Sequence, residues 1–347
     1  MSIRKILYSA LIFLVVTMMS CDSKMYFTTL DIMKPAEVTF PLGINNVVIV
    51  NNSVPQPAFI GHYNTQLTGN TTTENLRFDS AAIFTTSALK DALRNKGFFN
   101  NVELSLTNQN FSDSYKYINK LSSTNVKALC NMYNANAVIS LERIFFSDNI
   151  SEFYLDDGEF YNELDVKVKT EWSIYDIDSR SNTIQFVDSF LWQSSNYDRK
   201  ITRDSLPKRY DALVDACILS GSNIADRMIP QWEKEDRYFF LSNNKLMNQA
   251  MDSVPYRKWE KAIELWKIAA DSSKSEKIKY QSYNNIAVSY EIIGNIDNAI
   301  DYALKALNSF SNYSYGSDKD RSLLVAYNLS LKKRKDELKL LQKQLGN

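Results

Sequence analysis

The stretch SYNNIAVSYEIIGNIDNAIDYALKAL, residues 282–307, decides how the C-terminal third of the chain folds. Apolar and small residues recur three or four positions apart on both sides of Gly294, which predicts two amphipathic helices. Gly294 and Asn295 supply the turn between them. Small residues such as Ala287 and Ala299 allow close contact between the helices. The stretch therefore predicts a tightly packed helical pair.

The spacing in this stretch resembles a tetratricopeptide repeat. Eight residues fall where that repeat places its packing residues: Tyr283, Ile286, Ala287, Tyr290, Gly294, Ala299, Tyr302 and Ala306. Upstream, the second-helix pattern recurs at Trp259, Ala262, Ile263, Trp266 and Ala269. Ala262 then corresponds to Ala299, an offset slightly longer than the usual period of about 34 residues.

A single repeat cannot bury its apolar face alone, so we expect about two repeats with flanking helices. The last helix, residues 320–345, is expected to close the stack as a polar cap, with the basic run 332–335 on a solvated face. The resemblance implies a groove that binds a protein or peptide segment. Tyr256, Trp259, Trp266 and Tyr290 are candidates to line it, although the same residue types also pack cores, and core packing is favoured. The candidate packing or groove residues are Trp259, Ala262, Trp266, Tyr283, Ala287, Tyr290, Gly294, Ala299, Tyr302 and Ala306.

Residues 45–230 show a different pattern, of short apolar runs alternating with helical segments. The run 47–50 reads as a buried strand, and residues 164–174 alternate between apolar and polar side chains as a strand buried on one face does. The predicted order is β-α-β-α-β-β-β-α, an α/β layer with a mixed sheet. With the all-α tetratricopeptide-like region that follows at residues 231–347, the chain is predicted to be α+β.

The stretch between the first strand and the first helix, residues 53–79, is rich in Pro, Gly, Asn and Thr. It reads as an unusually long loop, which is functional, mobile or hides an unrecognised element. His62, the single histidine of the chain, lies in it and is expected to be exposed and inert. Cys130 and Cys217 lie on apolar helix faces and are expected to be buried thiols, with a bridge between them left open.

The N-terminus has the pattern of an export signal. Arg4 and Lys5 precede an apolar run that ends at Ser20 and Cys21, and this run is shorter than a membrane span. The pattern resembles a bacterial lipoprotein signal, which implies that Cys21 carries the lipid after cleavage. Met18 departs from the usual Leu of that signal. The predicted layout is a signal peptide at 1–20, a tether at 21–44, an α/β envelope domain at 45–230 and a helical repeat domain at 231–347.

Composition excludes several classes of function. Lys and Arg number 40 and so do Asp and Glu, which argues against nucleic acid as the main partner. Nine glycines form no nucleotide-binding pattern, and a single histidine with three cysteines forms no recognisable metal site. The acidic stretch 152–163 lacks calcium-loop spacing and is expected to be a solvated hairpin loop. No cofactor and no metal are expected.

Two further resemblances concern the layout of the chain. The element order, with residues 93–99 (LRNKGFF), looks like small envelope modules such as the N-terminal domain of the Tol propeller protein and the curli-secretion lipoprotein. Cys21, residues 35–38 and 47–52 and the repeats resemble an uncharacterised lipoprotein family of Bacteroidales-type anaerobes. The modules imply binding or assembly, not enzymatic activity.

The sequence therefore predicts a lipid-anchored envelope protein at the outer membrane, on its periplasmic face or at the cell surface. It is expected to act as a protein-binding or assembly scaffold through its helical repeats. A glycan-binding lipoprotein is the alternative, because 12% of the residues are aromatic and aromatic rings stack on sugars. An enzyme is the third possibility and ranks last, because the sequence marks out no pair of carboxylates for glycoside hydrolysis.

Overall fold

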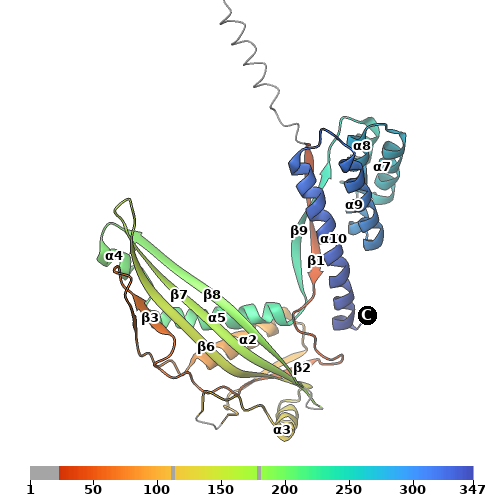
Figure 1. Cartoon of the computed structure of the whole chain (residues 1–347). Helices are drawn as coiled ribbons and strands as arrows, with labels where there is room; N and C mark the ends of the chain where they lie inside the picture. Colours follow the sequence, from red (N-terminus) through yellow and green to blue (C-terminus); the bar gives the residue numbers. More distant parts are fainter. Residues whose placement is uncertain (1–22, 111–113, 178–180, 347) are drawn as a thin grey trace, which may run out of the picture. The chain divides into compact units, whose positions relative to one another are not determined.

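A computed structural model describes residues 23–110, 114–177 and 181–346 (Figure 1). The predicted signal peptide and Cys21 lie outside the described residues. The described chain forms two compact units. We call residues 36–231 with 343–346 the α/β unit, and residues 23–35 with 232–342 the helical unit.

The α/β unit is built on a mixed sheet, as predicted, with seven strands where the sequence predicts five. Its strands are β2 (Asn46–Asn51), β3 (His62–Thr65), β4 (Thr71–Thr73), β5 (Asn101–Ser105), β6 (Ala137–Tyr154), β7 (Phe160–Asp176) and β8 (Ser181–Asn196). Strand β2 pairs in parallel with β5 and β6, and β3 pairs in parallel with the far end of β6. Strands β6, β7 and β8 form a long antiparallel meander (Figure 1).

Four helices belong to this unit: α2 (Ala81–Lys96), α3 (Ser123–Tyr133), α4 (Arg199–Asp204) and α5 (Arg209–Met228). Helices α2 and α5 pack together over one sheet face, and Gly221 of α5 permits their close approach. A Cβ atom at Gly221 would lie 2.4 Å from the Thr85 carbonyl oxygen of α2. Helix α3 packs on the apolar cluster that contains Val48 and Val50 of β2. The predicted element order is present, with β3, β4 and α4 added.

The stretch 53–79 is not an irregular loop throughout. Strands β3 and β4 form an antiparallel hairpin within it, with Tyr63 opposite Thr73. These strands are polar, and all three residues of β4 are exposed, so they lack the apolar alternation that marks a strand in sequence.

The helical unit contains α6 (Lys245–Met251), α7 (Trp259–Ser272), α8 (Glu276–Ile292), α9 (Ile296–Ser311) and α10 (Asp318–Leu345). Helices α8 and α9 meet at the predicted turn, where Gly294 has a φ of +80° that favours glycine. No helix within the described residues is both long enough and apolar enough to cross a membrane.

A two-stranded sheet also belongs to the helical unit. It pairs β1 (Met25–Lys34) with β9 (Gln231–Phe240). The predicted tether at 21–44 therefore contains a strand, and the region 231–347 begins with a strand rather than a helix. The sequence hides β1 because only Ile32 of its ten residues is fully buried and its partner lies about 200 residues later.

Candidate functional site

Strand β9 lies against the helix face for which a binding groove was predicted. The ring of Phe239 is fully buried and stacks on two tryptophans of α7. Its centroid lies 6.3 Å from that of Trp259, with an interplanar angle of 9°, and 5.6 Å from that of Trp266, at 18°. The two tryptophans thus cover a residue of the protein's own chain.

Helix α8 contacts the backbone of β9 through two buried asparagines. The Phe240 N–H donates to Asn285 Oδ1 at 2.7 Å, and Asn285 Nδ2 donates to the Phe240 carbonyl at 2.9 Å. Asn284 Nδ2 donates to the Tyr238 carbonyl at 3.2 Å. Because these bonds involve main-chain groups, the helices recognise β9 largely as an extended backbone.

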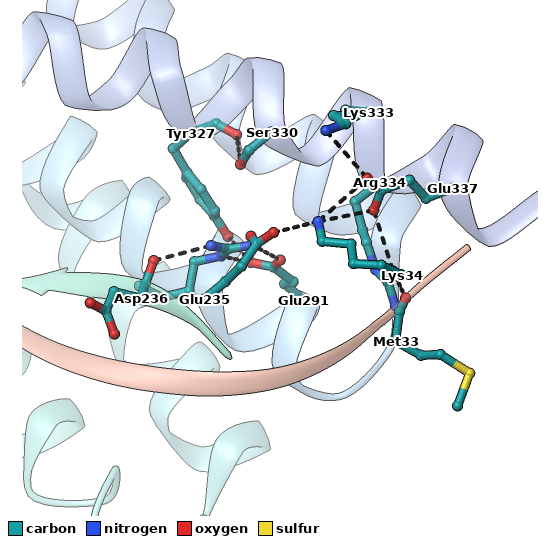
Figure 2. A network of polar contacts seen from close by, with 11 residues as sticks. Met33, Lys34, Glu235, Asp236, Glu291, Tyr327, Ser330, Lys333, Arg334 and Glu337 are labelled. Carbon is teal, nitrogen blue, oxygen red and sulfur yellow. Dashed lines mark hydrogen bonds and ion pairs between the residues drawn. The ribbon is translucent and has the colours of Figure 1, made fainter. Parts of the chain in front are cut away.

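An ion network holds the polar side of β9 (Figure 2). Arg237 donates through Nε and Nη2 to the two carboxylate oxygens of Glu291, each at 2.7 Å, and through Nη2 to Glu235 at 2.7 Å. Glu291 also accepts from the Tyr327 hydroxyl at 2.9 Å. Burial alone would lower the pKa of Arg237, but the bonds and charges of Glu291 and Glu235 outweigh it and raise that pKa.

The same network reaches β1 from α10. Lys34 forms ion pairs with Glu235 and with Glu337, the second at 3.2 Å (Figure 2). Arg334 donates to the Met33 carbonyl and pairs with Glu337 at 3.4 Å. The basic run 332–335 is therefore not wholly a solvated face, because Arg334 is mostly buried between a strand and its own helix.

The start of the described chain is fastened by a second polar cluster. The Ser23 hydroxyl donates to Asp320 Oδ2 at 2.6 Å, and the Tyr280 hydroxyl donates to the same oxygen at 2.8 Å. Gln281 Nε2 donates to Ser23 Oγ at 3.0 Å. Ser23 is buried. A serine two positions after Cys21 is thus part of the core of the helical unit.

All of the candidate repeat residues except Gly294 belong to or pack against the core of the helical unit. Five are fully buried: Ala262, Trp266, Ala287, Ala299 and Ala306. The rings of Trp259, Tyr283, Tyr290 and Tyr302 are partly buried, and Gly294 is exposed in its turn. Tyr256 is exposed and takes no part in covering β9. These side chains build a core, and the face that they form holds β9.

His62 is buried, contrary to the prediction of an exposed residue. It is 1% exposed, and its Nδ1 is hydrogen-bonded to Asp148 Oδ1. Arg209 Nε lies 2.7 Å from Asp148 Oδ2 as an ion pair that is not aligned as a hydrogen bond. Arg209 also donates to the Tyr63 carbonyl and to Asn64 Oδ1, both at 2.7 Å. The network joins β3, β6 and α5, and its members come from segments far apart in the sequence.

A buried carboxyl group that the sequence analysis missed lies on β6. Glu142 occupies the register shift between Leu141 and Arg143, where β6 bulges relative to β7. Asn52 donates to it at 2.6 Å, and the Tyr175 hydroxyl does so at 2.8 Å. Burial raises the pKa of Glu142, although these two hydrogen bonds lower it. The only local sequence signal is a charged residue within an apolar strand.

The thiols and the acidic loop behave as predicted. Cys130 and Cys217 are buried and unbridged, and burial raises the pKa of Cys217 to about 12. The acidic stretch forms the end of the β6–β7 hairpin. Within the part of the chain that the structure describes, no three His, Cys, Asp or Glu side chains are grouped to hold a metal ion.

A cavity of about 230 Å³ opens at the carboxyl end of β2, beside the start of α2. Phe78, Ile83 and Phe146 supply apolar walls, and Gln56 and Thr86 are among the polar residues. The Gln56 and Thr86 side chains are already bonded to backbone carbonyls within the unit. The cavity therefore offers mainly an apolar surface.

Comparison with known proteins gives two family matches. The model described as Domain of unknown function (DUF6340) matches residues 248–333, which lie in the helical unit. The model described as Domain of unknown function (DUF8603) matches residues 44–240, which run from just before β2 to the end of β9. No curated protein matches the chain. Because the second match covers more than half of the 347 residues, the chain belongs to the DUF8603 family.

Proposed function

We propose that this protein is a lipid-anchored envelope scaffold, with Cys21 as the lipidated residue and protein binding carried by the helical repeats. The observation that carries the proposal is the burial of Ser23 in the helical unit. Only one residue separates Ser23 from Cys21, so a lipid on Cys21 is attached directly to the helical unit. The helical unit, rather than the α/β unit, is then the part held at the membrane surface.

The helical unit also has the chemistry needed to bind extended protein chain. Asn284 and Asn285 bind main-chain groups, and Trp259 and Trp266 cover an aromatic side chain. Because β9 fills that face of the repeats, we place the contact with a partner protein on α10, the helix expected to close the repeat stack. Val325 and Leu329 stand one helical turn apart there, both exposed, and Leu329 is 61% exposed. A pair of exposed apolar side chains on one helix suits an apolar partner surface.

Fractionation and pull-down of the full chain test the two parts of the proposal separately. Cys21→Ser is expected to move the protein from the membrane fraction to the soluble fraction. Leu329→Asp is expected to leave it in the membrane fraction and to remove its co-purifying proteins. Asn308→Asp, an exposed change on α9, is the matched control and should retain them. Membrane retention by Cys21→Ser would contradict the anchor, and an unchanged set of partners in Leu329→Asp would contradict the contact on α10.

Glycan binding is a second candidate function, because aromatic rings are exposed at the end of the β6–β7 hairpin. Tyr154 is 63% exposed and contacts Phe160 with ring centroids 5.2 Å apart. Phe153 and Tyr161 form a second pair at 5.9 Å. Such rings present faces on which sugars stack. Tyr154→Ala should lower binding to envelope glycans while protein partners remain, and unchanged glycan binding would reject this site.

A further inference from the structure

Strand β8 forms one edge of the sheet in the α/β unit (Figure 1). Its sixteen residues pair with β7 from Ser181 to Asn196 in a continuous register, and no other strand among the described residues pairs with it. Along its free side, every second residue presents an unpaired N–H and C=O group. A strand of this length is a template for pairing with another strand.

Strand β8 lacks several of the usual protections of a sheet edge. Its sequence, SNTIQFVDSFLWQSSN, contains no lysine and no proline, and its register with β7 contains no bulge. Its single charged residue, Asp188, faces α5, where it accepts from Ser220 at 2.8 Å and from Asn223 at 3.3 Å. The side chains that face away from α5 are therefore all uncharged.

The side chains on this outer face form a palindrome. Read along the strand, they are Thr183, Gln185, Val187, Ser189, Leu191, Gln193 and Ser195. A hydroxyl, an amide and an aliphatic residue precede the central Ser189, and an aliphatic, an amide and a hydroxyl residue follow it. Such an order is matched to itself when two copies of the strand run in opposite directions.

We propose that β8 pairs with β8 of a second copy of this chain, antiparallel and centred on Ser189, so that two sheets join into one. This interface goes beyond the scaffold function and does not depend on the lipid. A two-fold axis at Ser189 makes the contact self-complementary, as in most homodimers. The axis places Val187 of each copy opposite Leu191 of the other.

The central apolar pairs give this register its preference. Val187 and Leu191 are 56% and 54% exposed, so the pairing covers four half-exposed aliphatic side chains. Gln185 then lies opposite Gln193, and Thr183 opposite Ser195.

Other registers are less favourable. The free N–H and C=O groups recur every second residue along β8. The two-fold axis can therefore move only by whole residues, which shifts the pairing by two and keeps outer-face side chains opposite one another. Centring on Asp188 sets two carboxylates directly opposite each other, which is destabilising. Centring on Phe190 sets Leu191 opposite Ser189 and Val187 opposite Gln193, and both aliphatic pairs are lost.

Cysteine crosslinking of the full chain tests the register. In a Cys21→Ser background, the native thiols that remain are the buried Cys130 and Cys217. Residues directly opposite in an antiparallel pair have Cα atoms about 4.5–5.5 Å apart, which is within the range of a disulfide. Ser189→Cys should therefore form a disulfide-linked dimer on mild oxidation. Gln193→Cys, on the same face of the same strand, should remain monomeric alone and should crosslink when mixed with Gln185→Cys.

The oligomeric state, measured by sedimentation equilibrium, tests the interface itself. The chain should be dimeric, and Val187→Lys, which removes both Val187–Leu191 pairs, should raise the dissociation constant by about 30-fold. Ile268→Lys, at an aliphatic residue of α7 that is 45% exposed, is the control and should stay dimeric. A chain that is monomeric throughout, a Val187→Lys dimer of unchanged affinity, or Gln193→Cys crosslinking as well as Ser189→Cys would each overturn the proposal.

Discussion

Replacing Asn285 by alanine should release β9 from the helical unit. The side chain makes two hydrogen bonds to the backbone of Phe240 and is fully buried. After truncation, the Phe240 N–H and C=O lose their partners in a dry environment. Each unsatisfied buried group costs about 1–3 kcal/mol, so the expected loss of local stability is about 3 kcal/mol.

Hydrogen exchange of the full chain, read by mass spectrometry on peptides that cover residues 231–240, measures this loss directly. About 3 kcal/mol corresponds to roughly a 150-fold increase in the opening equilibrium, and exchange of β9 amides should accelerate by that order. Peptides from β7 in the α/β unit should exchange at an unchanged rate. Asn284→Ala removes a single 3.2 Å bond and should give a smaller acceleration.

The control is Asn308→Ala, which truncates an exposed asparagine on α9 of the same unit. It should leave β9 exchange unchanged. If Asn285→Ala accelerates β9 exchange less than about threefold, then the side-chain bonds contribute under about 1 kcal/mol. The reasoning that α8 holds an extended segment by its backbone would then be wrong.

Three further predictions concern the α/β unit. Asp148→Ala leaves the buried Arg209 without its central partner and should lower the unfolding free energy by about 3–5 kcal/mol. Glu74→Ala, at the exposed end of the same network, should lower it by less than about 1 kcal/mol. Equal losses for the two variants in urea titration would contradict this reasoning. Because burial raises the pKa of Cys217 to about 12, iodoacetamide at about pH 8 should label this thiol only after the chain unfolds. Rapid labelling of the native chain, measured by peptide mass spectrometry, would refute its burial. Burial raises the pKa of Glu142 above 4.5, so the stability that its protonated form contributes is present below that pH and is lost as pH rises through the folded-state pKa. The unfolding free energy of Glu142→Gln should lack this loss, and parallel pH profiles for the variant and the natural chain would argue against it.

Much of the fold is predictable because many of its helices and strands have a recognisable pattern of apolar residues within their own sequence. The buried run of β2 and the alternation of β7 reflect burial of one or both strand faces, and both strands form where the pattern places them. Helices α8 and α9 follow from the spacing of small and apolar residues around Gly294. In each case the information lies within about 20 residues.

The features that sequence reasoning missed depend on distant partners. His62 is buried with its ring bonded to Asp148, which in turn pairs with Arg209, and nothing within the stretch 53–79 indicates either residue. Strand β1 exists because β9 pairs with it, and its own residues alternate too weakly to mark it. The packing role of Trp266 was predictable, but its contact with Phe239 required knowing where β9 lies.

The pairing of β1 with β9 has a consequence for the order in which the chain folds. Residues 36–231 are inserted between two parts of the helical unit, so β1 precedes its partner β9 by the whole length of this insertion. Among the described residues, the strands of this inserted part pair only with one another, so its sheet can form without β1 or β9. The sheet of the α/β unit can therefore form before the helical unit has its second strand, its helices or the Asp320 partner of Ser23. The most N-terminal strand of the structure is thus among the last to find its place.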